Sequence, residues 1–136
     1  MVQTLNSVIP AIAALVVLGS MAAASLAPAG RTKPSQWRIP AGLAALFFVA
    51  SLQAMASGGM FGFWTEHVRN DWGNQIFVDL LLCAGSAYFL LLPRARAVGM
   101  TPLLWLAGIA ALGSIGLLAM LARVLYREER AEAATT

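Results

Sequence analysis

Four apolar stretches, each long enough to cross a lipid bilayer as a helix, dominate this sequence. They cover about residues 6–27, 39–58, 74–93 and 102–122. A helix needs about 20 residues to cross the hydrocarbon core, and a helix satisfies its own backbone hydrogen bonds where lipid offers no partners. The composition agrees, because 60% of the residues are hydrophobic and only 11% are charged. A typical soluble domain has about 25% charged residues. The sequence therefore predicts an all-α, integral membrane four-helix bundle.

The predicted bundle is a single transmembrane domain over residues 1–136, with an interfacial segment over 60–73 and a polar tail over 124–136. The first apolar stretch is interpreted as a retained helix. The alternative is a signal peptide, since "SMAAASLAPAG" offers small residues that suit cleavage. However, "MVQTLN" has no Lys or Arg, whereas the first part of a signal peptide is basic.

Basic residues lie at the ends of the apolar stretches, where they indicate orientation. The net charge is +3, but these residues are not clustered with aromatic residues as nucleic-acid surfaces require, so no nucleic-acid partner is expected. With 102–122 as one span, five Lys or Arg lie on one side of the membrane and four on the other. Because cytoplasmic loops are richer in Lys and Arg, we expect a multi-pass protein, in a bacterial inner membrane, with both termini outside. The two sets are Arg31, Lys33, Arg38, Arg94 and Arg96 against Arg69, Arg123, Arg127 and Arg130.

The segment over 60–73, "MFGFWTEHVRNDWG", is too polar to cross the bilayer. Trp64, Val68 and Trp72 recur every four residues, which favours a short amphipathic helix lying on the membrane surface. Glu66 and His67 fall on other faces of that helix. The plainer alternative is a solvated loop anchored by two tryptophans.

Asp79 lies about one turn inside the third apolar stretch. An acid at the centre of a membrane helix costs roughly 2.5–3.5 kcal/mol on insertion scales, so it should face the interior of the bundle and have a partner. Gln75 shares its helical face, and Gln53 or Arg123 could supply the partner from another helix. Asp79 is either a structural polar clamp or a functional residue.

The sequence offers few other chemical groups. It has one histidine, His67, and one cysteine, Cys83; no metal-ligand spacing, nucleophile–base pair or phosphate-binding loop is present. We therefore expect no metal and no cofactor, although His67 as a single axial ligand to a haem or chlorin stays open. The candidate catalytic residues, should the protein be an enzyme, are Asp79, Glu66 and His67.

The stretches "DWGNQIFVDLLLCAGSAYFLLLPRARAVGM" and "GSIGLLAMLARVLYREE" combine an early Asp-Leu pair, a basic turn and a Leu-rich run that ends in Arg. In this pattern the second half of the chain resembles the DUF2834-like small bacterial membrane proteins. More distantly it resembles the ABA4-like family, which is linked to neoxanthin formation. The resemblance implies a four-helix bundle with Asp79 as its marked position.

These observations predict a polar site at the outer end of the bundle that binds, or acts on, a lipid or isoprenoid-like molecule. The predicted ligand-binding residues are Gln53, Gln75, Asp79, Arg123, Trp64 and Trp72, with Glu66 and His67 in the covering segment. The main alternative is a non-catalytic accessory subunit of a larger membrane complex, or a homo-oligomer, joined through Gly and Ala faces. A small multidrug exporter is a third alternative, although the first span lacks the carboxylate of such exporters.

Overall fold

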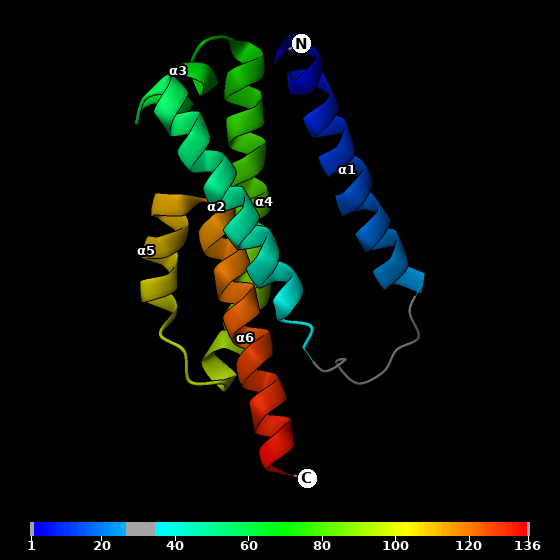
Figure 1. Cartoon of the computed structure of the whole chain (residues 1–136). Coiled ribbons are helices and arrows are strands. Elements are labelled where there is room, and N and C mark those ends of the chain that lie inside the picture. The colour runs from blue at the N-terminus through cyan, green and yellow to red at the C-terminus, as the bar shows by residue number, and fades with distance from the viewer. Residues whose placement is uncertain (1, 27–34, 136) are drawn as a thin grey trace. The chain divides into compact units, whose positions relative to one another are not determined.

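The computed structural model describes residues 2–26 and 35–135, and every regular element in these ranges is a helix (Figure 1). The predicted all-α class is therefore confirmed for this part of the chain. The chain divides into two compact units, Met1–Arg31 and Thr32–Thr136, which are described separately. The first contains α1 (Val2–Leu26), a helix without a charged side chain. Ala27, the predicted end of the first span, lies outside the described residues.

The second unit contains two long apolar helices, α2 and α4, that are long and apolar enough to cross a membrane. α2 agrees within one residue with the predicted span 39–58, whereas α4 begins three residues before the predicted span 74–93 and ends four residues after it. Most of their large apolar side chains are exposed: Phe47, Leu82 and Leu90 are 50, 65 and 78% exposed. A long helix in the core of a soluble protein would bury such side chains. The helices of this unit are α2 (Arg38–Gly58), α3 (Gly62–His67), α4 (Asp71–Ala97), α5 (Pro102–Leu112) and α6 (Ser114–Ala134).

The predicted single span over 102–122 is wrong, because the chain turns back at Gly113. Gly113 has φ 56° and ψ −128°, a conformation open mainly to glycine, and it separates α5 from α6. The two helices form an antiparallel hairpin about midway along α4 (Figure 1). Close approach is needed here, because a Cβ on Gly116 would lie 2.6 Å from the carbonyl oxygen of Gly108. At 11 residues, α5 is about 16 Å long, roughly half the hydrocarbon thickness.

The segment predicted as a polar tail, 124–136, continues α6 as a helix to Ala134. This helix returns to the end of the molecule where α4 finishes. Arg94 of α4 forms a two-pronged ion pair with Glu128 of α6, with N–O distances of 2.9 and 2.6 Å. Arg127 donates to the carbonyl oxygen of Val98 at 2.9 Å. The segment after Arg123 therefore belongs to the same end as the basic turn, and not to the opposite end as predicted.

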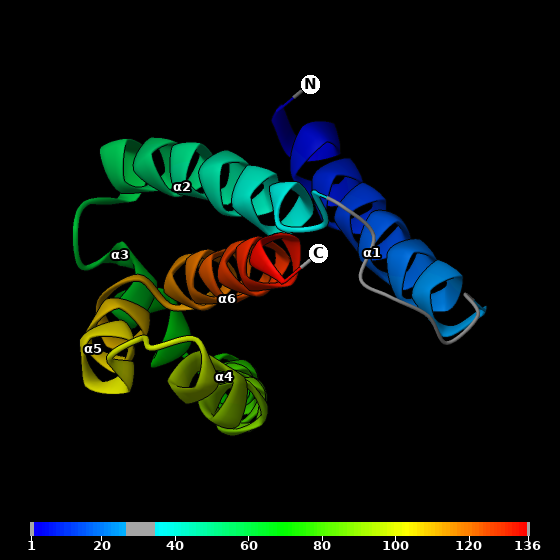
Figure 2. The same ribbon diagram turned by 90° about the horizontal axis from the view of Figure 1, so that it is seen from below.

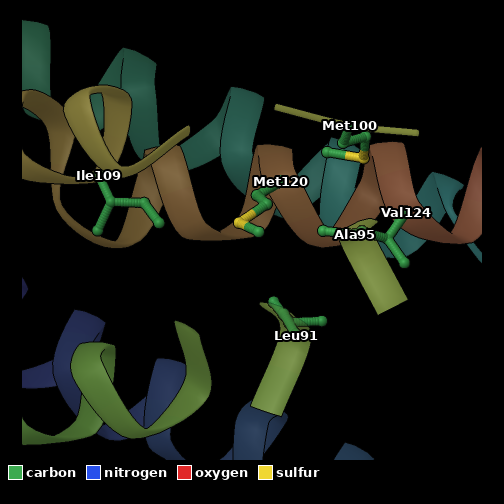
Figure 3. Packing of buried hydrophobic residues seen from close by; sticks show 6 residues of the cluster. All are labelled: Leu91, Ala95, Met100, Ile109, Met120 and Val124. Atoms are coloured by element: carbon green, nitrogen blue, oxygen red, sulfur yellow. The ribbon is translucent and has the colours of Figure 1, made fainter. Parts of the chain in front are cut away.

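Viewed along its length, the second unit has α6 in the middle, with α2 on one side and α4 and α5 on the other (Figure 2). Close backbone contacts join α6 to each of these helices, whereas α2 and α4 make none with each other. The four-helix bundle is thus not confirmed, because the fourth predicted span supplies two antiparallel helices instead of one. The core lies between α4, α5 and α6 (Figure 3). It consists of Leu91, Ala95, Met100, Ile109, Met120 and Val124.

The turn between α4 and α5 lies at the end of the molecule where α4 finishes, and its hydrogen bonds hold that end in place. Gly99 has φ 68°, its N–H donates to the carbonyl of Arg96, and the N–H of Met100 donates to the carbonyl of Ala95 at 2.9 Å. This is a Schellman motif, which ends the helix and satisfies its last carbonyls. Met100 is thereby placed in the core beside Ala95. The turn presents its carbonyl groups to Arg127.

Candidate functional site

The structure brings together three of the residues predicted for the outer-end site. Asp79, Gln75 and Trp72 line an open depression of about 500 Å³ along α4. All three side chains are exposed. Asp79 makes no hydrogen bond or ion pair with any residue in the described ranges. The described lining consists of α4 residues: Trp72, Asn74, Gln75, Ile76, Val78, Asp79 and Leu82.

The partners expected for Asp79 lie elsewhere. Gln53 is an exposed residue of α2, a helix that makes no close backbone contact with α4. Arg123 lies on α6, where its guanidinium carbon is 5.7 Å from the ring centre of Tyr126. The predicted contact of Asp79 with Gln53 or Arg123 is therefore not formed, since the turn at Gly113 carries Arg123 to the end of the molecule where α4 finishes.

The predicted interfacial helix over 60–73 is divided in the structure. Trp64 lies on α3, whereas Trp72 lies in the first turn of α4. Asn70 caps α4, its side-chain oxygen accepting from the N–H of Gly73 at 2.8 Å. A Cβ on Gly73 would lie 2.6 Å from the carbonyl oxygens of Glu66 and His67. A glycine is therefore needed where α3 meets α4.

The side chains of α3 are engaged locally rather than gathered around a reactive centre. Glu66 pairs with Arg69 at 3.0 Å, and both side chains are about two-thirds exposed. The ring of His67 lies edge-on to Phe77 at 5.1 Å between centres, and its Nδ1 is hydrogen-bonded to the carbonyl of Phe63. Within the described ranges, no three His, Cys, Asp or Glu side chains come together as metal ligands do.

A second open groove, between α2 and α6, has a different character. It measures about 530 Å³ and is lined by alanines, aromatic rings and one charged side chain. Small residues let two helices approach closely, and here they form its floor. Of the predicted ligand-binding residues, only Arg123 lines it. The lining is Trp37, Ala41, Ala44, Trp105, Ala119, Ala122, Arg123 and Tyr126.

Aromatic rings form one end of the α2–α6 groove. Trp37 and Tyr126 meet edge to face, with ring centres 5.4 Å apart. Trp37 lies in the turn before α2 and Tyr126 on α6, so this contact also joins the two helices. The sequence signal that could have found this groove is the pair of i, i+3 alanines on each helix, Ala41 with Ala44 and Ala119 with Ala122.

Comparison with known proteins adds no assignment: no family model matches the chain, and neither a curated protein nor a solved structure matches it.

Proposed function

We propose that this protein binds a lipid or isoprenoid-like amphiphile in the α2–α6 groove while spanning a bacterial inner membrane more than once. The observation that carries the proposal is the lining of the groove: small apolar residues along its length and the guanidinium of Arg123 beside the ring of Tyr126 at one end. Such a lining suits a ligand with an apolar chain and a polar head. Ligand sites commonly combine apolar walls with a few placed polar groups.

The position of the groove supports a ligand that enters from the membrane. It is lined in part by α2, a helix long and apolar enough to span, so an apolar chain could enter sideways. Trp37, Trp105 and Tyr126 surround it. Trp and Tyr favour the boundary between hydrocarbon and water, where the ring is apolar and its N–H or O–H stays hydrated. The polar head would then lie at that boundary.

Filling the groove tests this function. Ala41 lines it, so Ala41→Phe should reduce the amount of amphiphile that co-purifies with the protein, as measured by native mass spectrometry. Ala45→Phe adds the same ring one turn along α2, at an exposed residue outside the groove, and should retain the wild-type amount. Equal retention by both variants, with both still folded by circular dichroism, would contradict the proposal.

A second candidate, an accessory subunit of a larger membrane complex, is favoured by Asp79. This exposed carboxylate lies eight residues inside α4, about 12 Å along the helix. An acid at such a depth ordinarily faces a polar partner, which another chain would supply. Asp79→Asn should then reduce the size of the complex on native gels, whereas Asp71→Asn, at the start of α4, should leave it unchanged. A complex insensitive to Asp79→Asn would remove the support for this candidate.

A further inference from the structure

We infer that the head of the bound amphiphile is the phosphate of an anionic membrane phospholipid, held by Arg38, Arg123 and Arg130. The inference rests on the proposed function, since the same α2–α6 groove would receive the acyl chain. It adds the chemical class of the ligand and the residues that select it.

The three guanidinium groups gather around one aromatic pair. The guanidinium carbons of Arg123 and Arg130 lie 5.7 and 5.3 Å from the ring centre of Tyr126. That of Arg38 lies 5.7 Å from the ring of Trp37, and the two rings are in edge-to-face contact. Residues from the start of α2 and from the middle and later turns of α6 thus bring three positive charges to one end of the groove. Cation–π contact within about 6 Å attracts a guanidinium to a ring.

These contacts leave the charges and the N–H donors free for a ligand. Within the described part of the chain, the side chains of Arg38, Arg123 and Arg130 form no ion pair and no hydrogen bond. A guanidinium carries five N–H donors and suits phosphate oxygens. Ring contact fixes the position of the guanidinium without neutralising it.

The acidic residues nearby in sequence have other partners. Glu128 is paired with Arg94, and a carboxylate oxygen of Glu129 accepts from the backbone N–H of Ser35 at 3.0 Å. The hydrogen bond from a backbone N–H leaves the negative charge on Glu129, but this one carboxylate does not balance the three guanidinium groups at the end of the groove. An anionic lipid head would balance this positive charge, and a zwitterionic head, which has no net charge, would balance less of it. Charge complementarity accordingly favours an anionic phospholipid.

The test compares two lipids that differ only in the head. Purified full-length protein in neutral detergent is mixed with equal amounts of phosphatidylglycerol and phosphatidylcholine bearing the same acyl chains, and bound lipid is counted by native mass spectrometry. Wild type should prefer phosphatidylglycerol. Each of Arg123→Gln and Arg130→Gln should reduce that preference about fivefold, the effect of one basic residue near an anionic lipid surface.

Arg96→Gln is the matched control. Arg96 lies at the same end of the molecule and is exposed, but it makes no ring contact in the described structure, so its loss should leave the preference unchanged. An equal loss in all three variants would mean that only net charge matters and would overturn the inference. Equal binding of both lipids by wild type would also overturn it, while leaving the proposed function intact.

Inorganic phosphate distinguishes a lipid site from a site for free anions. At millimolar concentration it should not displace phosphatidylglycerol from wild type, because the acyl chain contributes to binding in the groove. Displacement by phosphate would overturn the assignment of a lipid. Failure of Ala41→Phe to reduce binding of either lipid would instead contradict the proposed function itself.

Discussion

Gly116 shows how a single atom governs the contact between α5 and α6. A Cβ at this position would lie 2.6 Å from the carbonyl oxygen of Gly108 and 2.8 Å from the backbone nitrogen of Ile109, so one helix would have to move. Gly116→Ala should therefore lower the free energy of unfolding by about 1–3 kcal/mol, the usual cost of overpacking. Denaturant titration in detergent micelles, followed by circular dichroism, would measure this change.

Gly108→Ala is the control from the other side of the same contact. A Cβ on Gly108 would have no atom within 4 Å, and alanine favours the helix by about 1 kcal/mol over glycine. This variant should be as stable as wild type or more so. Equal destabilisation by the two substitutions would contradict the hairpin geometry, since the contact is crowded on one side only.

At the residue scale, the sequence predicted the kinds of side chain that contribute to helix contacts better than it predicted which side chains contact each other. Small residues suit close contacts between helices, and Gly116 makes such a contact with α5. The prediction that Gln53 or Arg123 contacts Asp79 was wrong, because whether either residue reaches it depends on how the helices pack and where each one ends. The contact between Trp37 and Tyr126, the ring beside Arg123, was equally hard to foresee, since the two residues are far apart in sequence.

Among the elements, the hairpin of α5 and α6 depends on the backbone of Gly113. A residue with a Cβ is strained at φ 56° and ψ −128° by about 1–3 kcal/mol, whereas it fits a continuous helix well. Gly113→Ala should therefore reduce the population of the hairpin. Arg94→Cys with Glu128→Cys, in a Cys83→Ala background, would report this through cross-linking by a short bifunctional thiol reagent.

The cross-link should form efficiently in the chain that keeps Gly113 and weakly in the Gly113→Ala chain. Gly42→Ala is the control, because it lies within α2, without a positive φ, and a Cβ there would have no neighbour within 4 Å. Unchanged cross-linking in Gly113→Ala would show that this glycine is not what holds the turn.

At the element scale, α2 and α4 could be predicted because each contains an apolar stretch long enough to cross a bilayer, but hydropathy did not place the ends of α4. Asn70 caps α4, and Gly99 ends it; the predicted end at Pro93 was early by one turn. The break in the last span could not be read from hydropathy, because the sequence is equally apolar on both sides of Gly113. A glycine is compatible with either a helix interior or a turn, and the packing of Gly116 on α5 favours the turn.

For the whole molecule, composition predicted the helical class, and two helices able to span a membrane agree with the membrane assignment. It could not predict that α6 returns to the end where α4 finishes, which relocates every basic residue of the last helix. Three of the predicted ligand-binding residues line the α4 depression. A different one, Arg123, is the only predicted ligand-binding residue that lines the α2–α6 groove. The groove depends on how α2 meets α6, and no local pattern specifies that meeting.

The return of α6 also changes the expected orientation of the chain. Of the described basic residues, six lie at the end where α4 finishes and one, Arg69, at the other end: Arg38, Arg94, Arg96, Arg123, Arg127 and Arg130 form the larger set. Because Lys and Arg concentrate on the cytoplasmic side, we expect the C-terminal end of α6 to be cytoplasmic rather than outside. This count of six basic residues against one replaces the earlier count of five against four, which assumed a single span over 102–122.

Two reporter fusions separate orientation from topology. A reporter active only in the cytoplasm should give signal when fused after Ala134. It should give none when inserted at Met60, between α2 and α3, because α6 finishes at the end of the molecule where α2 begins, whereas Met60 follows the other end of α2. Signal at Met60 alone would reverse the orientation and keep the hairpin. Equal results at both positions would contradict the hairpin, because a continuous last span would carry Ala134 to the side of Met60. Whether the two fusions give different signals thus tests the turn at Gly113. Which of the two fusions is active tests the side of the membrane that the arginines face.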